Sequence, residues 1–439
     1  MPQGRLAVTF SPADPDAGAA RPAIEFRGVD ILFAGGAGAQ SARMKAALAL
    51  VDAGVSRAEI AWQTGFVAGV TGASLSVEEG EISVLMGLSG SGKSTLLRAA
   101  NGLNKVTRGQ VLLHDDDGGV GVVDLASCDA ATLRRMRLRR VAMVFQSFAL
   151  LPWRTVRENV GLGLELRGVS AAERRRLVDE KLHLVSLDQW ADRYAHELSG
   201  GMQQRVGLAR AFATEADILL MDEPFSALDP LIRGKLQDEL LDLQQKVKKT
   251  ILFVSHDLDE AVKLGNHISI MEGGRIVQTG TAEDIVLRPA DAYVAQFVQH
   301  LNPLTVLKAG TVMRGRGDLH QEGGGVWLDH RRAYHLTLDG EGRPGKAFHN
   351  GEPMPVTELH GFDGPQSVVP QGLLVVPYSF PLRLMMHLRQ VSGHPVLLAS
   401  DDRFAGVCDG DDILKALCGL QRGSDAAVPV PVPVAERVG

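Results

Sequence analysis

The stretch Gly87-Leu-Ser-Gly-Ser-Gly-Lys93-Ser94-Thr95 decides the fold of this chain. It follows the apolar run Glu81-Ile-Ser-Val-Leu-Met86, which predicts a buried strand, and it opens a segment with helical periodicity from Lys93 to about Leu103. Glycines between a strand and a helix let backbone N–H groups converge on phosphate oxygens, and the start of the helix adds a partial positive charge. The sequence therefore predicts a phosphate-binding loop in an α/β fold.

The side chains of this loop have separate predicted roles. Lys93 would place a full charge against the β- and γ-phosphates of a nucleotide, and the hydroxyl of Ser94 would bind Mg²⁺. The other loop residues predicted to contact the nucleotide are Gly87, Ser89, Gly90, Ser91, Gly92 and Thr95. The alternative is a plain glycine-rich turn, and the strand and helix on either side argue against it.

Three more short apolar runs lie farther along the chain, at 141–145, 217–221 and 251–255. Runs of this length that are apolar on both faces are typical of strands buried in a mostly parallel sheet. Residues 267–271 and 275–279 predict a β-hairpin, because glycines supply the turn between them.

Polar side chains follow each of these three runs. Asp222 is predicted to hold Mg²⁺, and Glu223 to polarise an attacking water. Gln146 and His256 follow the other two runs, where ligands of open α/β folds bind. Without other signals, the two carboxylates would be interpreted as helix caps, and Gln146 and His256 as ordinary polar residues at strand ends. The phosphate loop in the same chain favours a catalytic role for them.

Further motifs narrow the class of protein. Leu198-Ser-Gly-Gly-Met-Gln-Gln-Arg205 resembles the signature motif of the ATP-binding subunits of ABC transporters, and Ser226-Ala-Leu-Asp229 resembles their D-loop. Gln146 matches the Q-loop and His256 the switch histidine, all in family order. Met202 stands where many members carry Gln, which leaves the phosphate-facing Ser-Gly-Gly part intact.

The resemblance covers residues 23–300 and implies a P-loop NTPase core with an antiparallel β-subdomain and a helical subdomain at about 147–215. It implies that ATP with Mg²⁺ lies between the phosphate loop of one copy and the signature of a second copy, placed head to tail. Closure of the two copies around ATP would expel water from the site, and hydrolysis would let the two copies separate. The residues that the resemblance adds to the nucleotide site are Ser199, Gly200, Gly201 and Asp229, and it adds Gln146 to the metal ligands.

Adenine stacks on an aromatic ring early in this family's domain. Phe33 is the best candidate and Phe26 the alternative, although either could be a core residue. Phe33 lies 54 residues before Gly87, a long interval for the family, and an inserted helical hairpin at about 38–64 accounts for the excess. A capping box at 56–59 would begin the second helix of this hairpin. The simplest interpretation is that the insertion has no catalytic or binding role.

Segments 143–152 and 255–261 and the insertion are similar to the importer branch that serves glycine betaine, proline betaine or choline, and 58–65 looks nearest to the choline members. That resemblance implies a homodimer of ATPase subunits, a membrane permease and a periplasmic or lipid-anchored solute-binding protein. It also implies a peripheral location on the cytoplasmic face of the bacterial inner membrane. The alternatives are an importer for another solute, such as an amino acid, and a soluble ABC ATPase without a transport role.

Residues 147–165 are the expected permease-facing surface. Their apolar anchors would be Phe148, Leu150, Leu151 and Trp153. The alternative is that these side chains pack inside the helical subdomain. The basic run 134–140 is expected to be a solvated helix face rather than a nucleic-acid site.

Residues 301–423 are predicted to form a small α+β domain. Clear periodicity begins only near 366, and the order expected from there is strand 373–376, helix 382–391, strand 395–399, strand 403–408 and helix 411–417. The last part resembles half of a CBS module in which Asp412 matches a ribose-binding Asp. Asp409 stands where the family usually has Thr or Ser, which favours a degenerate regulatory or structural domain over an adenosine site.

The length and composition of the chain limit the classes of protein to which it can belong. The chain has 439 residues, which suits two or three domains, and its net charge of −6 argues against sequence-independent nucleic-acid binding. Cys128, Cys408 and Cys418 include no CxxC pair, so no disulfide framework is expected. Neither a membrane-spanning helix nor a secretory signal is expected. Residues 1–22 and the proline-rich 424–439 are predicted to be extended tails.

Overall fold

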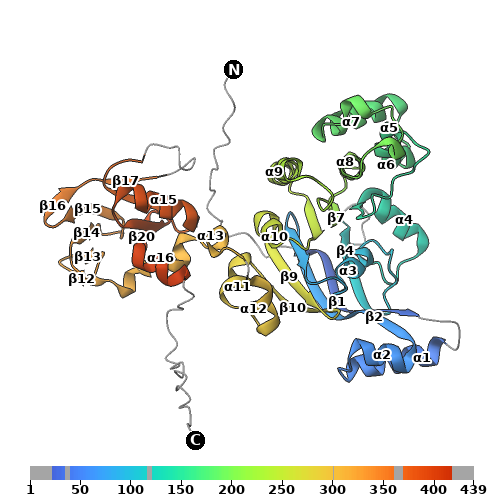
Figure 1. The fold of residues 1–439 in the computed structure, drawn as a ribbon, viewed down its shortest axis with the longest axis horizontal. Helices are drawn as coiled ribbons and strands as arrows, with labels where there is room; N and C mark the ends of the chain where they lie inside the picture. Colours follow the sequence, from blue (N-terminus) through green and yellow to red (C-terminus); the bar gives the residue numbers. More distant parts are fainter. Residues whose placement is uncertain (1–21, 35–39, 116–120, 300, 360–368, 418–439) are drawn as a thin grey trace, which may run out of the picture. The chain divides into compact units, whose positions relative to one another are not determined.

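The computed structural model describes residues 22–34, 40–115, 121–299, 301–359 and 369–417 (Figure 1). They fall into two compact units that divide between Leu301 and Asn302, and each is described by itself. Of the predicted tails at 1–22 and 424–439, residues 1–21 and 424–439 lie outside the described residues, as does Cys418, whereas Pro22 begins a strand. None of the helices in the described ranges has both the length and the apolar character needed to cross a membrane.

The first unit is built on a six-stranded sheet in the order β10-β9-β3-β8-β7-β6. Strands β9, β3, β8, β7 and β6 run parallel, and β10 pairs with β9 in the predicted hairpin. The four predicted apolar runs are therefore confirmed as neighbouring strands. The strands are β3 (Ile82–Met86), β6 (Val141–Val144), β7 (Ile218–Asp222), β8 (Thr250–Val254), β9 (His267–Glu272) and β10 (Arg275–Gly280).

Alternating residues of these strands enter two different cores, which is why the runs are apolar on both faces. Leu252 and Val254 join the core shared with helix α3 (Lys93–Ala99) and the second sheet. Phe253 joins the core beneath the helical region. Further helices of this unit are α4 (Ala130–Arg139), α9 (Pro230–Val247), α10 (Leu258–Leu264), α11 (Ala282–Leu287) and α12 (Ala292–Val298).

The second sheet is antiparallel, in the order β2-β1-β4-β5, and it matches the expected β-subdomain. Its strands are β1 (Pro22–Ala34), β2 (Phe66–Glu78), β4 (Arg108–Asp115) and β5 (Gly121–Asp124). The insertion between β1 and β2 contains the two predicted helices, α1 (Gln40–Asp52) and α2 (Arg57–Thr64). Ser56 caps α2 by accepting the N–H of Glu59, but the Glu59 carboxylate accepts from Gln63, so only half of the capping box forms.

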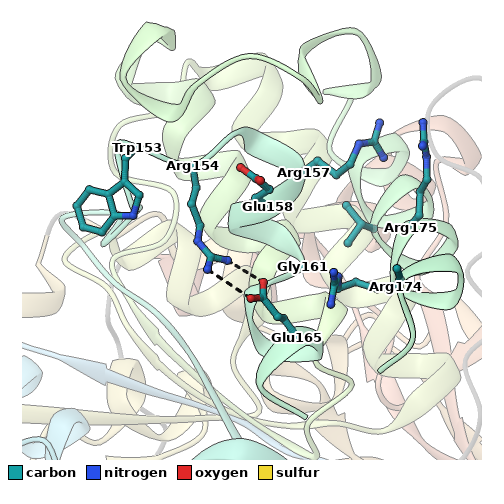
Figure 2. Close-up of a pocket in the computed structure, with 10 residues that line it drawn as sticks. Trp153, Arg154, Arg157, Glu158, Gly161, Glu165, Arg174 and Arg175 are labelled. Atoms are coloured by element: carbon teal, nitrogen blue, oxygen red, sulfur yellow. Dashed lines mark hydrogen bonds and ion pairs between the residues drawn. The ribbon is translucent and has the colours of Figure 1, made fainter. Parts of the chain in front are cut away.

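The helical region contains α5 (Val156–Val160), α6 (Leu162–Leu166), α7 (Ala171–Leu184) and α8 (Gly200–Ala213). Its surface holds a cavity of about 610 Å³, whose lining includes Trp153, Arg154 and Glu165 (Figure 2). Arg154 donates to Glu165 at 2.8 Å, whereas the indole of Trp153 is 70% exposed. The predicted basic run lies on α4, whose one buried residue is Met136.

The second unit contains two five-stranded sheets. One has the order β11-β20-β19-β18-β17 and confirms the strand and helix order predicted after residue 366. The other is an antiparallel meander, β12-β13-β14-β15-β16, that the sequence did not predict. The elements are α13 (Pro303–Val306), α14 (Ala309–Val312), β11 (Arg314–Gly315), β12 (His320–Glu322), β13 (Gly325–Trp327), β14 (Tyr334–Leu338), β15 (Pro344–His349), β16 (Glu352–Met354), β17 (Val356–Glu358), β18 (Leu373–Pro377), α15 (Leu382–Ser392), β19 (Val396–Ser400), β20 (Arg403–Cys408) and α16 (Gly410–Leu417).

Candidate nucleotide site

The loop between β3 and α3 has a shape that only glycine permits at two positions. Gly87 has φ +141°, and a Cβ added there would lie 2.1 Å from the carbonyl oxygen of Met271. Gly92 has φ +102°, and its Cβ would lie 2.5 Å from the carbonyl oxygen of Gly69. Glycine at these two positions therefore lets the loop lie directly against the backbone of Met271 and Gly69, in a conformation that a side chain would prevent.

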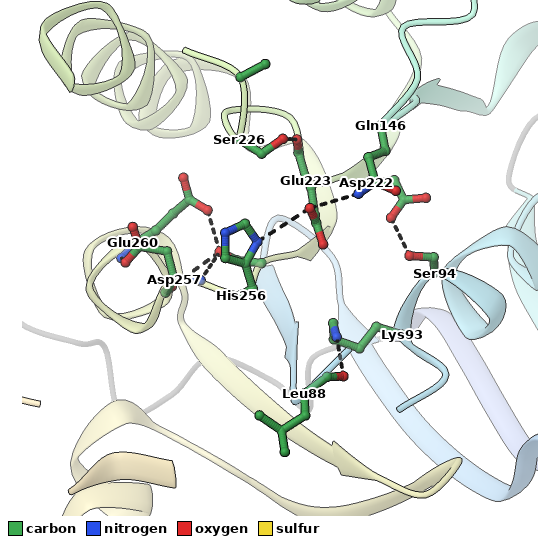
Figure 3. Close-up of polar contacts among 12 residues, drawn as sticks. Leu88, Lys93, Ser94, Gln146, Asp222, Glu223, Ser226, His256, Asp257 and Glu260 are labelled. Carbon is green, nitrogen blue, oxygen red and sulfur yellow. Dashed lines mark hydrogen bonds and ion pairs between the residues drawn. The ribbon is translucent and has the colours of Figure 1, made fainter. Parts of the chain in front are cut away.

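Lys93 is held inside this loop. Its Nζ donates to the carbonyl oxygens of Gly87 at 2.8 Å and Leu88 at 2.9 Å (Figure 3). Burial lowers the pKa of Lys93, and the nearby carboxylates of Glu223 and Asp222 partly oppose that shift. The ammonium thus sits close to the loop backbone and faces two carboxylates, which favours binding of a polyanion with a divalent cation.

Asp222, at the end of β7, is fully buried and paired on both oxygens. Its Oδ1 accepts from the hydroxyl of Ser94 at 2.7 Å, and its Oδ2 accepts from Arg98 at 2.9 Å. The hydroxyl and carboxylate oxygens are hard donors of the kind that Mg²⁺ prefers, so the two predicted metal ligands fit that ion. The sequence prediction missed Arg98, although its place one helical turn after Ser94 could have indicated it.

Glu223 lies at the centre of the three predicted catalytic residues. Its Oε2 accepts from Nε2 of Gln146 at 3.0 Å and lies 3.4 Å from Nδ1 of His256 (Figure 3). The residue has φ +49°, a left-handed conformation that is costly for a side chain of this kind. Its N–H donates to the carbonyl of Val254 on β8, a contact that holds the strained backbone in place. The carboxyl ends of β6, β7 and β8 therefore bring these side chains together.

The signature residues lie at the start of α8. Ser199 is the N-cap, exposed, and its hydroxyl accepts from the N–H of Met202. Gly200 is also exposed, and Gly201 packs near the backbone of Ala227, from which an added Cβ would be 3.2 Å away. The signature and the phosphate loop thus belong to different elements, α8 and α3.

Gln204 connects the signature helix to the backbone of Glu223, and the sequence prediction missed this contact. It is almost completely buried, donates to the carbonyl of Glu223 at 3.0 Å and accepts from the N–H of Ala227 at 3.1 Å. Asp229 follows in the same loop and caps α9 by accepting from the N–H of Ile232 at 3.0 Å. The D-loop is therefore tied to both α8 and α9.

The two aromatic candidates for adenine stacking differ in exposure. Phe26 is only 1% exposed and belongs to the core between the sheets, so its ring has no face available to a base. Phe33 is 43% exposed and lies beside Gly69 and Thr95, as a Cβ added to Gly69 would be 2.7 Å from the Phe33 ring. The structure therefore leaves Phe33 as the candidate of the two.

The candidate residues of the second unit are occupied by ion pairs. Asp412 is buried and accepts from Arg314 at 3.0 Å, and Asp409 accepts from Arg389 at 2.8 Å. Burial disfavours the ionised form of Asp409, but the hydrogen bonds from Arg389 and from the N–H of Gly410 outweigh it and lower the pKa. Both carboxylates therefore serve the packing of this unit.

The site geometry, a phosphate loop facing paired carboxylates with a signature helix behind them, defines an ABC-type ATPase. The family model described as ABC transporter matches residues 70–226. The glycine betaine/proline betaine transport system ATP-binding protein ProV of Escherichia coli is 42% identical over 381 residues, which cover 84% of this chain and 92% of that relative.

Two other relatives match over the ATPase part. The glycine betaine/carnitine transport ATP-binding protein GbuA of Listeria monocytogenes is 51% identical, over 61% of this chain and 66% of its own length. The glycine betaine transport ATP-binding protein OpuAA of Bacillus subtilis is 48% identical, over 62% of this chain and 63% of its own length. The chain belongs to the family of ABC transporter ATP-binding subunits that includes these proteins. It is an ATPase, as the sequence predicted.

Proposed function

We propose that this chain hydrolyses ATP to energise an importer of glycine betaine, proline betaine or choline. Glycine betaine or proline betaine is the solute named for the relatives that match it, and choline rests on the sequence resemblance of 58–65 alone. The observation that carries the ATPase chemistry is the convergence of Gln146, Glu223 and His256 beside the Ser94–Asp222 pair.

In this proposal the phosphate loop binds the triphosphate, with Lys93 turning from its own loop carbonyls to the β- and γ-phosphates. Ser94, Asp222 and Gln146 would hold Mg²⁺, which supplies charge to the phosphate oxygens. The loop residues Ser89, Gly90, Ser91, Gly92 and Thr95 would bind the phosphates, and Phe33 would stack on adenine.

Glu223 would accept a proton from the attacking water, with Gln146 and His256 keeping its carboxylate oriented. A second copy would complete the site from the far side. Its exposed Ser199, with Gly200 and Gly201, would donate to the γ-phosphate, because those residues form the start of an anion-attracting helix. Asp229 would act across the same interface.

The cavity of the helical region would receive a cytoplasmic segment of the permease. The exposed Trp153 offers an aromatic anchor, and Arg174 and Arg175 line the same cavity. Of the four predicted anchors, Phe148, Leu150 and Leu151 are only partly exposed, which fits packing within the helical region better than docking. This assembly would place the chain on the cytoplasmic face of the inner membrane, with a solute-binding protein on the other side.

The second unit would act as a degenerate CBS-like regulatory or structural domain, since the carboxylate that matches the ribose-binding position is already paired with Arg314. Deleting 302–439 tests this. Loss of regulation with intact ATPase supports the role, whereas unchanged, fully regulated transport opposes it.

The deciding experiment reconstitutes the ATPase in vesicles with a betaine permease and a solute-binding protein. ATP hydrolysis is measured against a panel of betaines, choline and amino acids. We expect stimulation by the quaternary amines alone. Stimulation by an amino acid would favour the other importer class, and failure to form any complex with a permease would favour a soluble ABC ATPase.

A further inference from the structure

Arg57 attaches the helical insertion between β1 and β2 to the phosphate loop. Arg57 is the first residue of α2 and is half-buried. Its Nε donates to the carbonyl of Ala68 on β2 at 2.5 Å, and its Nη1 donates to the carbonyl of Gly90 at 2.9 Å. A single guanidinium therefore joins the insertion, the edge strand of the antiparallel sheet and the loop that would receive the phosphates.

The opposite end of the turn between α1 and α2 is anchored as well. Asp52, the last residue of α1, accepts two hydrogen bonds from Arg108, at 2.6 and 2.9 Å. Arg108 also donates to Asp30 at 2.6 Å, and the fully buried Asp30 accepts from the N–H of Gly72 at 2.8 Å. Both ends of the turn are therefore fixed to the body of the unit.

Apolar packing holds the two helices in the same position. Ala47 and Val51 of α1 and Ile60 of α2 are buried against Leu32 of β1 and Ala68 of β2. Ala68 thus contributes its side chain to the packing of the insertion and its carbonyl to Arg57. This arrangement restricts the backbone of the residue that carries the guanidinium, so that the contact with Gly90 costs little further ordering.

The loop at Gly90 benefits from such a contact. Gly90 has φ +78° and open space around its missing side chain, and its peptide is held within the loop by the N–H of Ser91, which donates to the carbonyl of Leu88 at 3.1 Å. The guanidinium on the carbonyl of Gly90 is a second hold on the same peptide, from outside the loop. Charge-assisted hydrogen bonds of this kind are stronger than neutral ones.

We propose that Arg57 is a positioning residue for the nucleotide, through which the insertion sets the affinity of the phosphate loop. This proposal rests on nucleotide binding at that loop. Removal of the guanidinium leaves the Gly90 peptide held by the hydrogen bond from Ser91 to Leu88 alone, so more of the loop must be ordered when the phosphates bind. The chemical step is unaffected, because Glu223, Gln146 and His256 come from the parallel sheet.

The test compares Arg57→Ala, Arg57→Lys and Arg43→Ala in the full chain. Arg43 is exposed on α1, and replacing it leaves both anchors of the turn in place, so it is the matched control. We measure the equilibrium Kd for a fluorescent ATP analogue, and kcat and KM for ATP hydrolysis. We expect Arg57→Ala to raise Kd and KM about tenfold, or about 1.4 kcal/mol, with kcat within about twofold. Arg57→Lys can reach one of the two carbonyls, so its Kd and KM should lie between those of the parent and of Arg57→Ala.

Lys93→Ala distinguishes a failure of the role of Arg57 from a failure of the nucleotide site. If Lys93→Ala abolishes binding but Arg57→Ala binds like the parent, the role of Arg57 is refuted and the nucleotide site stands. If Lys93→Ala also binds normally, the nucleotide site itself is wrong. Should Arg57→Ala fail to fold by circular dichroism, a folded Arg57→Lys with parental Kd and KM overturns the proposal.

Discussion

Replacing Glu223 by Gln separates proton acceptance from every other property of the site. The amide has nearly the volume of the carboxylate, and its oxygen can still accept from Nε2 of Gln146, now 3.0 Å from the carboxylate. The Glu223 side chain is 18% exposed, and an amide of the same shape fits its place. Among the groups proposed to act in hydrolysis, only the proton acceptor is lost.

The expected magnitude follows from that single loss. A positioned general base contributes about 10² to 10⁴-fold to the rate. At 1.36 kcal/mol for each factor of ten, the barrier for hydrolysis should rise by about 3–5 kcal/mol. ATP binding should be unchanged, because Lys93 and Ser94 are untouched. The variant should therefore accumulate as an ATP-bound dimer.

Single-turnover hydrolysis of radiolabelled ATP measures the rate, and size-exclusion chromatography with ATP measures the dimer. Ser226→Ala is the matched control. It removes a hydroxyl that donates to the backbone carbonyl of Glu223 at 3.0 Å and keeps the carboxylate. A Glu223→Gln rate within about threefold of the parent, at the same ATP occupancy, would refute the assignment of the base.

Lys93→Ala should abolish ATP binding, measured by filter binding; retained affinity would contradict the role of the loop. Asp222→Asn should leave Arg98 without its carboxylate and lower the free energy of unfolding by about 1–3 kcal/mol in urea, besides removing the Mg²⁺ dependence of ATP binding. Burial raises the pKa of Glu260. The folded state therefore retains a proton above the ordinary glutamate pKa of about 4.3, and stability falls as the pH rises past that value. Glu260→Gln should remove this decline in the urea midpoint, and an unchanged slope would argue against it. Trp153→Ala should reduce co-purification with the permease, and an undiminished yield would place the docking surface elsewhere.

The parallel sheet and its loop were predictable because their signals are local. Strands apolar on both faces stand out as short runs, and the glycines between β3 and α3 are required by backbone geometry at Gly87 and Gly92. The meander of the second unit carries no such signal. Strand β12 (His320–Glu322) has three exposed residues, and β16 (Glu352–Met354) is as short, so neither shows a buried face in the sequence.

The residues that support the site were less predictable than those that form it. Arg98, Gln204 and Arg57 contact backbone or carboxylate groups that are distant in sequence, and pairing across such separations depends on the folded sheets. Helix α3 also ends at Ala99, before the expected Leu103, because Gly102 adopts φ +67° in the turn that follows. Motifs thus predict reacting groups, and tertiary contacts place them.

The central claim is that two copies enclose ATP between the phosphate loop of one and the signature of the other. The most direct test mixes two differently tagged, otherwise cysteine-free chains that both carry Glu223→Gln. One chain has Leu88→Cys, whose native side chain is 63% exposed beside the loop, and the other has Ser199→Cys. A short thiol cross-linker should join the two chains with ATP and Mg²⁺ and leave them separate without nucleotide. Equal cross-linking with and without ATP, or none at saturating ATP, would contradict the claim.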